Sequence, residues 1–356
     1  MSKKNLLIFT LVFSLLLAGF AHAGNNVTVF IYHRFGDDRL PTTNVSVEAF
    51  VKQMDYLSTH NYNVISLTAL MKMVKQGVEL PAKTAVITID DAYQSVYENG
   101  WPVLQRYGFP FTIFVYAEGV NDGYGDYMTW TQLRELKEFG VDIQDHGYGH
   151  EHLGWKPEGV ADLAYQSWIS DDIRKSKAIL TRELGEAPRF FALPYGVYND
   201  SVLEELGKQG YEAVLTQDPG AVSNATDLFM VPRQPILGNE WATLDFFVKA
   251  LDLTDLPISD YSPAPSILKD PFIKNIEATI SHPEDFVDGT FGVWLSGLGW
   301  HPAVLKGDRL SATLQQSLNQ PTTRVVMSGR YKETGELAQR TWLLIHPQGE
   351  KATKQK

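Results

Sequence analysis

The sequence predicts an α/β protein, a parallel sheet covered by helices, with a small antiparallel β-sandwich after it. Short β-rich runs alternate with amphipathic helical runs from residue 26 to about residue 251. This alternation is typical of parallel sheets, open or closed into a barrel. Prolines cluster between residues 257 and 271, where the pattern changes. The runs beyond them are short, alternating and separated by Gly, Pro and Asp turns, as in a β-sandwich.

The elements of the first domain can be placed in order. Strands are expected at 27–32, 85–89, 111–116, 141–144, 190–193 and 213–215. Helices are expected at 46–60, at 129–139 and in a run that ends near residues 107–108. Ser46 is the expected N-cap of the first helix, because apolar residues follow it at helical spacing. Catalytic groups of parallel sheets lie on loops at the carboxyl ends of the strands, so functional residues are expected there.

The second domain is expected to consist of strands alone. Its alternating runs are 273–280, 291–295, 310–314, 322–327 and 341–345. The predicted organisation is a first domain at 24–255, a Pro-rich linker at 256–271, the sandwich at 272–347 and a polar tail at 348–356. A linker implies few contacts between the domains, so the first domain is expected to be separable. Trp294, Trp300 and Trp342 are either core residues or platforms for sugar rings.

Composition limits the chemistry that the chain can carry. It has 356 residues, a formal net charge of −11 and no cysteine. An acidic protein lacks the basic face of a nucleic-acid binder, so no nucleic-acid partner is expected. The absence of cysteine removes disulfides and thiolate metal sites. Any metal ion must therefore be held by His, Asp or Glu.

The first 23 residues have the pattern of a cleavable signal peptide. Lys3 and Lys4 precede an apolar run at 6–18, and Ala21-His22-Ala23 has the small residues of a cleavage site. The apolar run is shorter than the about 20 residues that span a membrane. We therefore expect export to the periplasm or the medium, without stable membrane insertion.

Two adjacent carboxylates, Asp90 and Asp91, follow the strand expected at 85–89. Neighbouring carboxylates at the end of a buried strand are costly unless a cation compensates them. One could bind a metal ion while the other acts as a base. A helix N-cap followed by an acidic first turn is the alternative, and it accounts for one of the two residues.

Three histidines lie within seven residues after the strand expected at 141–144, in the segment 146–152. His146 and His150 are four residues apart, so both imidazoles would point the same way in one helical turn. This spacing suits a divalent transition metal with a third ligand from elsewhere. His152 lies off that face and is expected beside the site or at the surface.

Three further pieces also follow expected strands. The turn Pro194-Tyr195-Gly196 exposes backbone N–H groups, of which that of Tyr195 could hold a developing oxyanion. Arg233 follows a short strand, and near the aspartate pair it would keep a base ionised. His33 ends the first strand and would lie on the same edge of the sheet.

Together and in this order, these pieces resemble the NodB-homology polysaccharide deacetylases, carbohydrate esterase family four. Residues 88–93 resemble the first motif of the family, His146-x-x-x-His150 its second, and residues 193–196 its third. The resemblance covers residues 30–235 and is greatest to the biofilm poly-N-acetylglucosamine deacetylase subgroup. It implies a distorted (β/α) barrel of about seven parallel strands.

The sequence departs from the family pattern at three places. Ala92 replaces the usual glycine in a turn that needs an unusual backbone. Arg189 lies five residues before Pro194 rather than two, so the base-orienting role passes to Arg233, as in the subgroup. The late Leu-x-His motif has no counterpart before residue 256, and His33 is its replacement.

The resemblance implies a role for each residue. Asp91, His146 and His150 would hold a divalent metal ion, zinc by default, with nickel, cobalt or iron also suited. Asp90, oriented by Arg233, would be the base, and His33 the acid. The Tyr195 N–H would stabilise the oxyanion. Tyr93, Pro194 and Tyr195 would contact the substrate.

The predicted activity is metal-dependent hydrolytic deacetylation of an acetylated glycan, of N-acetylglucosamine type, with release of acetate. The residues leave open whether the bond is an amide or an ester, and protein partners cannot be read from them. Two alternatives remain. One is an inactive glycan-binding protein, with Ala92 as the defect. The other is a glycoside hydrolase, whose carboxylates must flank the bond rather than adjoin each other.

Overall fold

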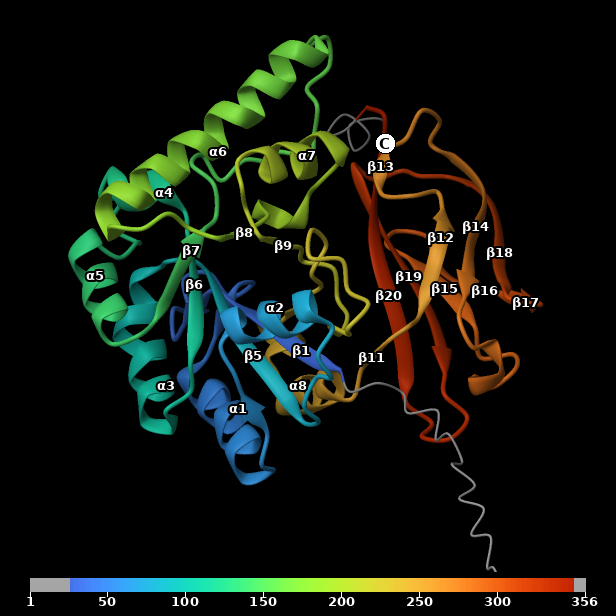
Figure 1. The fold of residues 1–356 in the computed structure, drawn as a ribbon, viewed down its shortest axis with the longest axis horizontal. Coiled ribbons are helices and arrows are strands. Elements are labelled where there is room, and N and C mark those ends of the chain that lie inside the picture. The colour runs from blue at the N-terminus through green and yellow to red at the C-terminus, as the bar shows by residue number, and fades with distance from the viewer. Residues whose placement is uncertain (1–25, 349–356) are drawn as a thin grey trace, which may run out of the picture.

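The computed structural model describes residues 26–348 of the chain. The signal peptide predicted at 1–23 and all but Gln348 of the tail predicted at 348–356 lie outside these residues. Within them, no helix is both long and apolar enough to cross a membrane. Figure 1 shows two parts side by side, a helix-covered sheet and an all-β part.

The first part is built on seven parallel strands, as the sequence predicts. They follow the order β10-β1-β5-β6-β7-β8-β9 and form a curled half-barrel. Their bounds are β1 Val27–Tyr32, β5 Thr84–Asp91, β6 Phe111–Val115, β7 Asp142–Asp145, β8 Phe190–Ala192, β9 Ala213–Leu215 and β10 Gln234–Pro235. An isolated bridge between Leu215 and Val231 links β9 to the segment before β10. The short strand β4 (Asn63–Val64) adds to β5, and β2 (Arg34–Phe35) pairs with β3 (Asn44–Val45).

Helices cover the outside of this sheet (Figure 1). They are α1 Val47–Thr59, α2 Leu67–Gln76, α3 Trp101–Tyr107, α4 Ala117–Asn121, α5 Trp130–Glu138, α6 Asp162–Leu184, α7 Asp200–Lys208 and α8 Leu244–Leu251. Short turns of other helix types are η1 Val96–Gly100, η2 Pro194–Gly196 and η3 Asn239–Ala242. Ser46 caps α1 as expected, since its side chain accepts the Ala49 N–H. Five of these helices were not predicted from the sequence, namely α2, α4, α6, α7 and α8.

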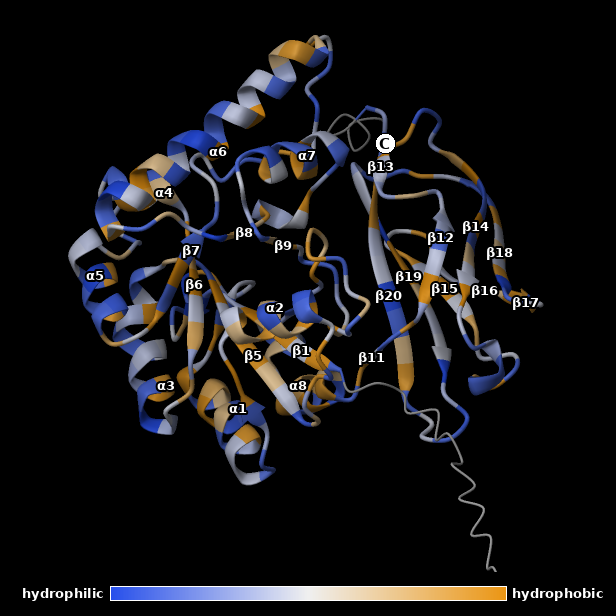
Figure 2. Cartoon of the chain, viewed as in Figure 1, coloured by the Kyte–Doolittle hydropathy of each residue, from blue (hydrophilic) through white to orange (hydrophobic). Residues whose placement is uncertain are grey.

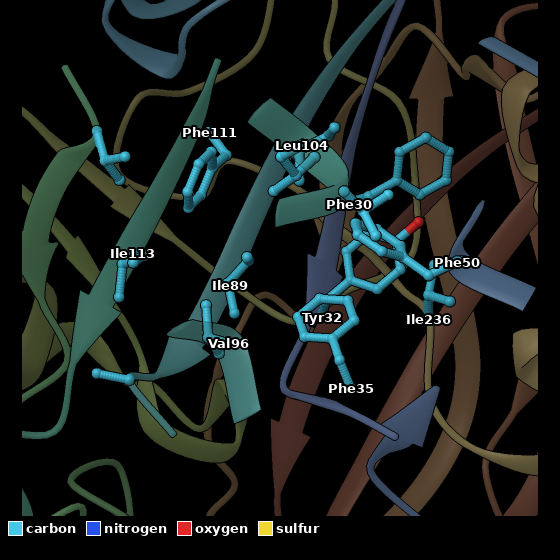
Figure 3. Packing of buried hydrophobic residues seen from close by; sticks show 14 of the residues in the cluster. Phe30, Tyr32, Phe35, Phe50, Ile89, Val96, Leu104, Phe111, Ile113 and Ile236 are labelled. Carbon is cyan, nitrogen blue, oxygen red and sulfur yellow. The ribbon is translucent and has the colours of Figure 1, made fainter. Parts of the chain in front are cut away.

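The core between β1, β5 and α1 is aromatic. Phe35 and Phe50 pack with ring centroids 4.4 Å apart, and Tyr32 contacts both rings. Figure 3 shows these rings together with Phe30. Figure 2 shows hydrophobic residues along β5 and α8, as expected of elements that contribute to a core. This packing fixes the end of β1, where His33 lies.

The second part is a two-sheet β-sandwich. The six-stranded sheet has the order β11-β20-β19-β15-β16, with β13 added to β20. Its strands are β11 Thr254–Asp255, β13 Ser266–Ile267, β15 Gly292–Leu295, β16 Gly299–Pro302, β19 Thr322–Arg330 and β20 Leu337–Ile345. The four-stranded sheet is β12 Ile258–Ser262, β14 Phe272–Ile280, β18 Arg309–Ser317 and β17 Val304–Lys306, in that order. A short turn, η4 (Pro283–Asp285), follows β14.

The linker predicted at 256–271 is wrong for much of this segment. Strands β12 and β13 lie within it and pair with β14 and β20. Pro257 and Pro263 flank β12, and Pro265 precedes β13. Because proline cannot donate to a strand ladder, it marks the ends of short strands as readily as a linker. The proline cluster therefore belongs to the sandwich.

The two parts share a hydrophobic cluster, contrary to the expectation of few contacts between them. Leu343 and Ile345 of β20 are buried among residues of the first part that include Val197 and Tyr198. Thr341 of β20 donates a hydrogen bond to the Pro219 carbonyl at 2.6 Å. Arg324 of β19 forms an ion pair with Asp218 of the first part, with an Nε–Oδ1 distance of 3.1 Å. The sandwich therefore packs directly against the first part and is not merely joined to it by a flexible linker.

Candidate active site

Asp90 lies at the carboxyl end of β5 and is fully buried. Arg233, also fully buried, donates from Nη1 to one carboxylate oxygen at 2.7 Å and from Nη2 to the other at 2.8 Å. Burial opposes ionisation of Asp90, but the Arg233 guanidinium together with His146 and His33 lowers the pKa of this carboxyl below its usual value. Asp90 is thus held as a carboxylate.

The Arg233 side chain is itself fixed by two neighbours. Its Nε donates to the Thr216 carbonyl at 2.9 Å, and its Nη1 also donates to the Thr88 hydroxyl at 3.2 Å. A bidentate guanidinium–carboxylate pair has a defined orientation as well as charge. The structure therefore brings Arg233 to Asp90, as the sequence analysis expected.

Asp91 points away from Arg233 toward the histidines. Its Oδ1 lies 3.3 Å from His146 Nε2 and 3.0 Å from His150 Nε2. Successive side chains of a strand point to opposite sides, which separates the two aspartates. Burial disfavours charge on Asp91, yet the two imidazoles bring its pKa well below the usual range. One ligand atom from each of these three residues lies within 4.8 Å of the others.

The two histidines lie on a loop and not on a helix, which corrects the expectation of one helical turn. The loop follows β7, and it turns because Gly147 and His150 have positive φ angles of 80° and 52°. The imidazoles converge all the same, with ring centroids 5.0 Å apart. His146 Nδ1 lies 2.8 Å from the Ala192 carbonyl, so its Nε2 lone pair faces Asp91 when Nδ1 carries the proton.

Two acidic residues to which the sequence assigned no role hold this loop. Asp172 of α6 accepts the Tyr148 and Gly149 N–H groups at 3.0 and 2.8 Å. Asp145 is buried behind His146 and accepts the Gly147 N–H at 2.9 Å. Burial raises the pKa of Asp145 to about 6, although Ser176 and other donors oppose the rise. No spacing in the sequence indicates Asp172, because α6 is remote along the chain, whereas Asp145 directly precedes His146.

Tyr195 forms the rim of the site. Its backbone has a φ of 58°, and its side chain is 44% exposed. The hydroxyl lies 3.1 Å from His150 Nδ1, and His152 stacks on the ring at 3.8 Å between centroids. His152 therefore lies beside the cluster, as expected. The preceding Pro194 is buried.

His33 is buried at the end of β1, with no hydrogen-bond partner for its Nδ1 among residues 26–348. Burial lowers the pKa of His33, and the charges of Asp91 and Asp90 act in the opposite direction. Tyr32 of β1 pairs with Ile89 of β5, so the next residues of the two strands, His33 and Asp90, are neighbours at the sheet edge. The position of His33 matches the sequence-based expectation.

Ala92 and Tyr93 complete the loop after β5. Ala92 is buried with a φ of 61°, so the turn does require the conformation that glycine adopts readily. A left-handed non-glycine residue costs about 1–2 kcal/mol, which the surrounding packing must offset. Tyr93 stacks on Tyr127 at 5.0 Å, and the Arg34 guanidinium lies 3.4 Å from its ring centre. Ala92 therefore adopts the turn conformation at a cost in backbone strain.

The curled parallel sheet and this cluster define a class of protein, a hydrolase with a buried carboxylate beside an Asp-His-His group. Residues 77–214 match the family model described as polysaccharide deacetylase. The chain therefore contains a polysaccharide deacetylase domain of the NodB-homology type, carbohydrate esterase family four.

Curated relatives carry the same description. The chain is 26% identical over 205 residues to the putative polysaccharide deacetylase YxkH of Bacillus subtilis, covering 58% of this chain and 69% of that protein. It is 27% identical over 219 residues to the poly-β-1,6-N-acetyl-D-glucosamine N-deacetylase of Staphylococcus epidermidis, covering 60% and 75%.

Solved structures agree on the fold. IcaB from Ammonifex degensii aligns with a TM-score of 0.53 at 28% identity, covering 63% of this chain and 97% of that one. The Streptococcus pyogenes deacetylase PplD aligns with a TM-score of 0.57 at 21% identity, covering 64% and 99%. More than a third of this chain is left uncovered by each of these matches.

Proposed function

We propose that this protein removes acetyl groups from an acetylated glycan by hydrolysis and releases acetate. The observation that carries the proposal is that the two adjacent aspartates have different partners. Asp90 is bound on both oxygens by Arg233, while Asp91 faces two imidazoles. A charged base therefore adjoins a separate set of ligand atoms, as hydrolysis of an acetyl group requires.

The residues present fit a divalent metal ion. Asp91 Oδ1 and His146 Nε2 are buried and have no hydrogen-bond partner in the described part of the chain, as expected of ligand atoms. Asp91, His146 and His150 would hold the ion. When bound, it would acidify a water molecule and polarise the acetyl carbonyl. Zinc suits these ligands, as do nickel, cobalt and iron, so the metal remains part of the proposal.

Asp90 acts as the general base in the proposed mechanism. Its Oδ2 lies 3.8 Å from His146 Nε2, so the carboxylate faces the ligand cluster. Asp90 takes a proton from the attacking water as that oxygen adds to the acetyl carbon. Arg233 keeps the carboxylate ionised and fixes its direction. A positioned base of this kind contributes about 10²–10⁴-fold to the rate.

Tyr195 and His33 act in the two steps that follow, stabilisation of the oxyanion and protonation of the leaving nitrogen. The Tyr195 N–H stabilises the negative charge that develops on the carbonyl oxygen. His33 delivers a proton to the departing nitrogen as the carbon–nitrogen bond breaks. Acetate and a free amino group are the products. The proton that the amine gains balances the one that Asp90 accepts.

We propose β-1,6-linked poly-N-acetylglucosamine as the substrate, with an amide as the bond that breaks. The support is the printed activity of the Staphylococcus epidermidis relative. We also propose that the chain acts in the periplasm or outside the cell, after removal of residues 1–23. The support is the charged, apolar and small-residue order of that segment.

Acetate release tests the proposal. Purified protein is incubated with β-1,6-linked N-acetylglucosamine oligomers, chitin oligomers and O-acetylated glycans, with and without a chelator. We expect release from the first substrate, loss of release with chelator and recovery when zinc is added back. Binding of the glycan without acetate release from any substrate would instead favour an inactive glycan-binding protein. Cleavage of the glycan chain would favour a glycoside hydrolase.

A further inference from the structure

We propose that Trp294 and Trp300 form a platform that binds pyranose rings of the same glycan, beyond the sugar that reacts. This inference rests on the proposed function, because it names further units of that substrate. Trp294 lies on β15 and Trp300 on β16, directly opposite each other. Directly opposed residues of two antiparallel strands project from the same face of the sheet.

Both indoles are open to solvent. Trp294 is 44% exposed and Trp300 is 58% exposed. Trp342 differs, since it is buried in the core of the sandwich and donates to the Pro263 carbonyl. Two large exposed aromatic side chains side by side are unusual on a protein surface and commonly mark a binding site. The tryptophans of this domain thus divide into one core residue and one exposed pair.

The Trp300 indole lies over the backbone of Gly292. A Cβ atom at Gly292 would lie 2.4 Å from Trp300 Nε1 and 2.5 Å from Cε2. The absence of a side chain at Gly292 therefore makes room for the ring. The indole thus rests on Gly292, and more than half of the residue stays open to a ligand.

The platform lies on the face of the sheet that docks onto the deacetylase domain. Val293 and Leu295, the neighbours of Trp294 in β15, point into the sandwich core. Trp294 pairs with Val326 of β19, and Val326 pairs with Thr341 of β20. The Thr341 side chain bonds to Pro219 of the first domain. In Figure 1, β20 lies beside the first domain, and β15 and β16 lie farther out.

Arg324 connects this face to the reaction centre. It lies two residues before Val326 in β19, so it projects from the same face. Its Nη2 donates to the Tyr195 carbonyl at 3.2 Å, and the Tyr195 hydroxyl lies beside His150. Trp300 is two strands, roughly 10 Å, away from β19. A glycan that leaves the reaction centre past Tyr195 therefore meets the two indoles next.

A neutral sugar chain suits this surface. The axial C–H groups of a pyranose form an apolar patch that packs on an indole, while its hydroxyls stay in water. Rigid aromatic rings bind such patches with little loss of conformational entropy. Shielding of the Gly292 backbone by an aromatic ring accounts for the position of Trp300 alone. It does not account for the exposure of Trp294, which the platform explains.

Chain-length dependence tests the platform. Acetate release is measured on a disaccharide and a hexasaccharide of β-1,6-linked N-acetylglucosamine, with Trp294→Ala, Trp300→Ala and the double variant. We expect the double variant to lose about tenfold more kcat/KM on the hexasaccharide than on the disaccharide, mainly through KM. Trp294→Tyr should recover part of the loss. Phe272→Ala, at a 41% exposed aromatic on the other sheet, is the matched control.

Direct binding separates this proposal from the proposed function. Titration of Asp90→Asn protein with the hexasaccharide, followed by indole fluorescence, should give a Kd that the double tryptophan change raises about tenfold. Equal chain-length dependence in wild type and double variant would overturn the platform while leaving deacetylation intact. Hexasaccharide binding that depends on both tryptophans, without acetate release by wild type, would retain the platform and reject the proposed activity. A dimeric wild type and a monomeric double variant, with glycan binding unchanged, would instead assign this face to self-association.

Discussion

Arg324 of the sandwich donates a hydrogen bond to the backbone carbonyl of Tyr195, at 3.2 Å from Nη2 to oxygen. Its Nε also donates to Asp218 at 3.1 Å, and Asp218 is buried in the first domain. Tyr195 has a left-handed backbone that nearby contacts must hold in place. The second domain therefore takes part in shaping the turn whose N–H is proposed to stabilise the oxyanion.

Replacement of Arg324 tests this contact. We expect Arg324→Ala to lower kcat by about tenfold or more, because a displaced oxyanion donor costs up to about 10²–10³-fold. The bound metal should remain, since Asp91, His146 and His150 are untouched. Arg309→Ala removes an arginine–glutamate pair elsewhere in the sandwich and is the control. Equal effects of the two changes would mean that Arg324 only stabilises the fold.

Removal of the sandwich should be harmful. A chain that ends near Asp260 is cut within β12, and it exposes the cluster that Leu343 and Ile345 cover. We expect aggregation or a large fall in melting temperature, because buried apolar side chains contribute about 1.5–3 kcal/mol each. Size-exclusion chromatography and circular dichroism measure this. A soluble, folded and fully active truncated protein would show that the interface is dispensable.

Asp90→Asn and Asp91→Asn should fail in different ways. Asp90→Asn should keep its metal and lose about 10²–10⁴-fold in turnover, because the amide removes the base but no ligand. Asp91→Asn should lose metal affinity, and added zinc should partly restore its rate. Metal content and acetate release are measured on both proteins. Metal loss in Asp90→Asn alone would reverse the two assignments.

The buried pair of Asp90 and Arg233 predicts a strong coupling in stability. Arg233→Met leaves a buried carboxylate without its cation, and Asp90→Asn leaves the cation without its carboxylate. Each should lower the free energy of unfolding by about 3–5 kcal/mol, and the double variant by less than the sum. Urea denaturation of the four proteins gives the coupling energy. Additive losses would show that the bidentate contact contributes little.

His33→Ala should discriminate between leaving groups. An amine departs only after it gains a proton, whereas an activated aryl alcohol departs without one. We therefore expect a far larger loss on acetamido sugars than on aryl acetates. Parallel kcat/KM measurements on both substrates decide the matter. Equal losses would assign His33 to packing at the end of β1.

The sequence alone determined the elements whose pattern is local. Helical spacing after Ser46 predicts α1, and continuous apolar runs predict β1, β5 and β6 within a few residues. Because the carboxyl ends of parallel strands meet at one edge, the same pattern placed Asp90, Asp91 and His146 together. The proline cluster misled for a related reason, since proline marks a strand end and a linker alike.

Only the tertiary structure decided which side chains contact each other. His146 and His150 converge through a loop with positive φ angles, which spacing alone cannot distinguish from a helical turn. Arg233 reaches Asp90 across 143 residues, and Arg324 reaches Tyr195 across 129. Local periodicity carries no information on such distant pairs, because the curl of the sheet and the docking of the two domains set them.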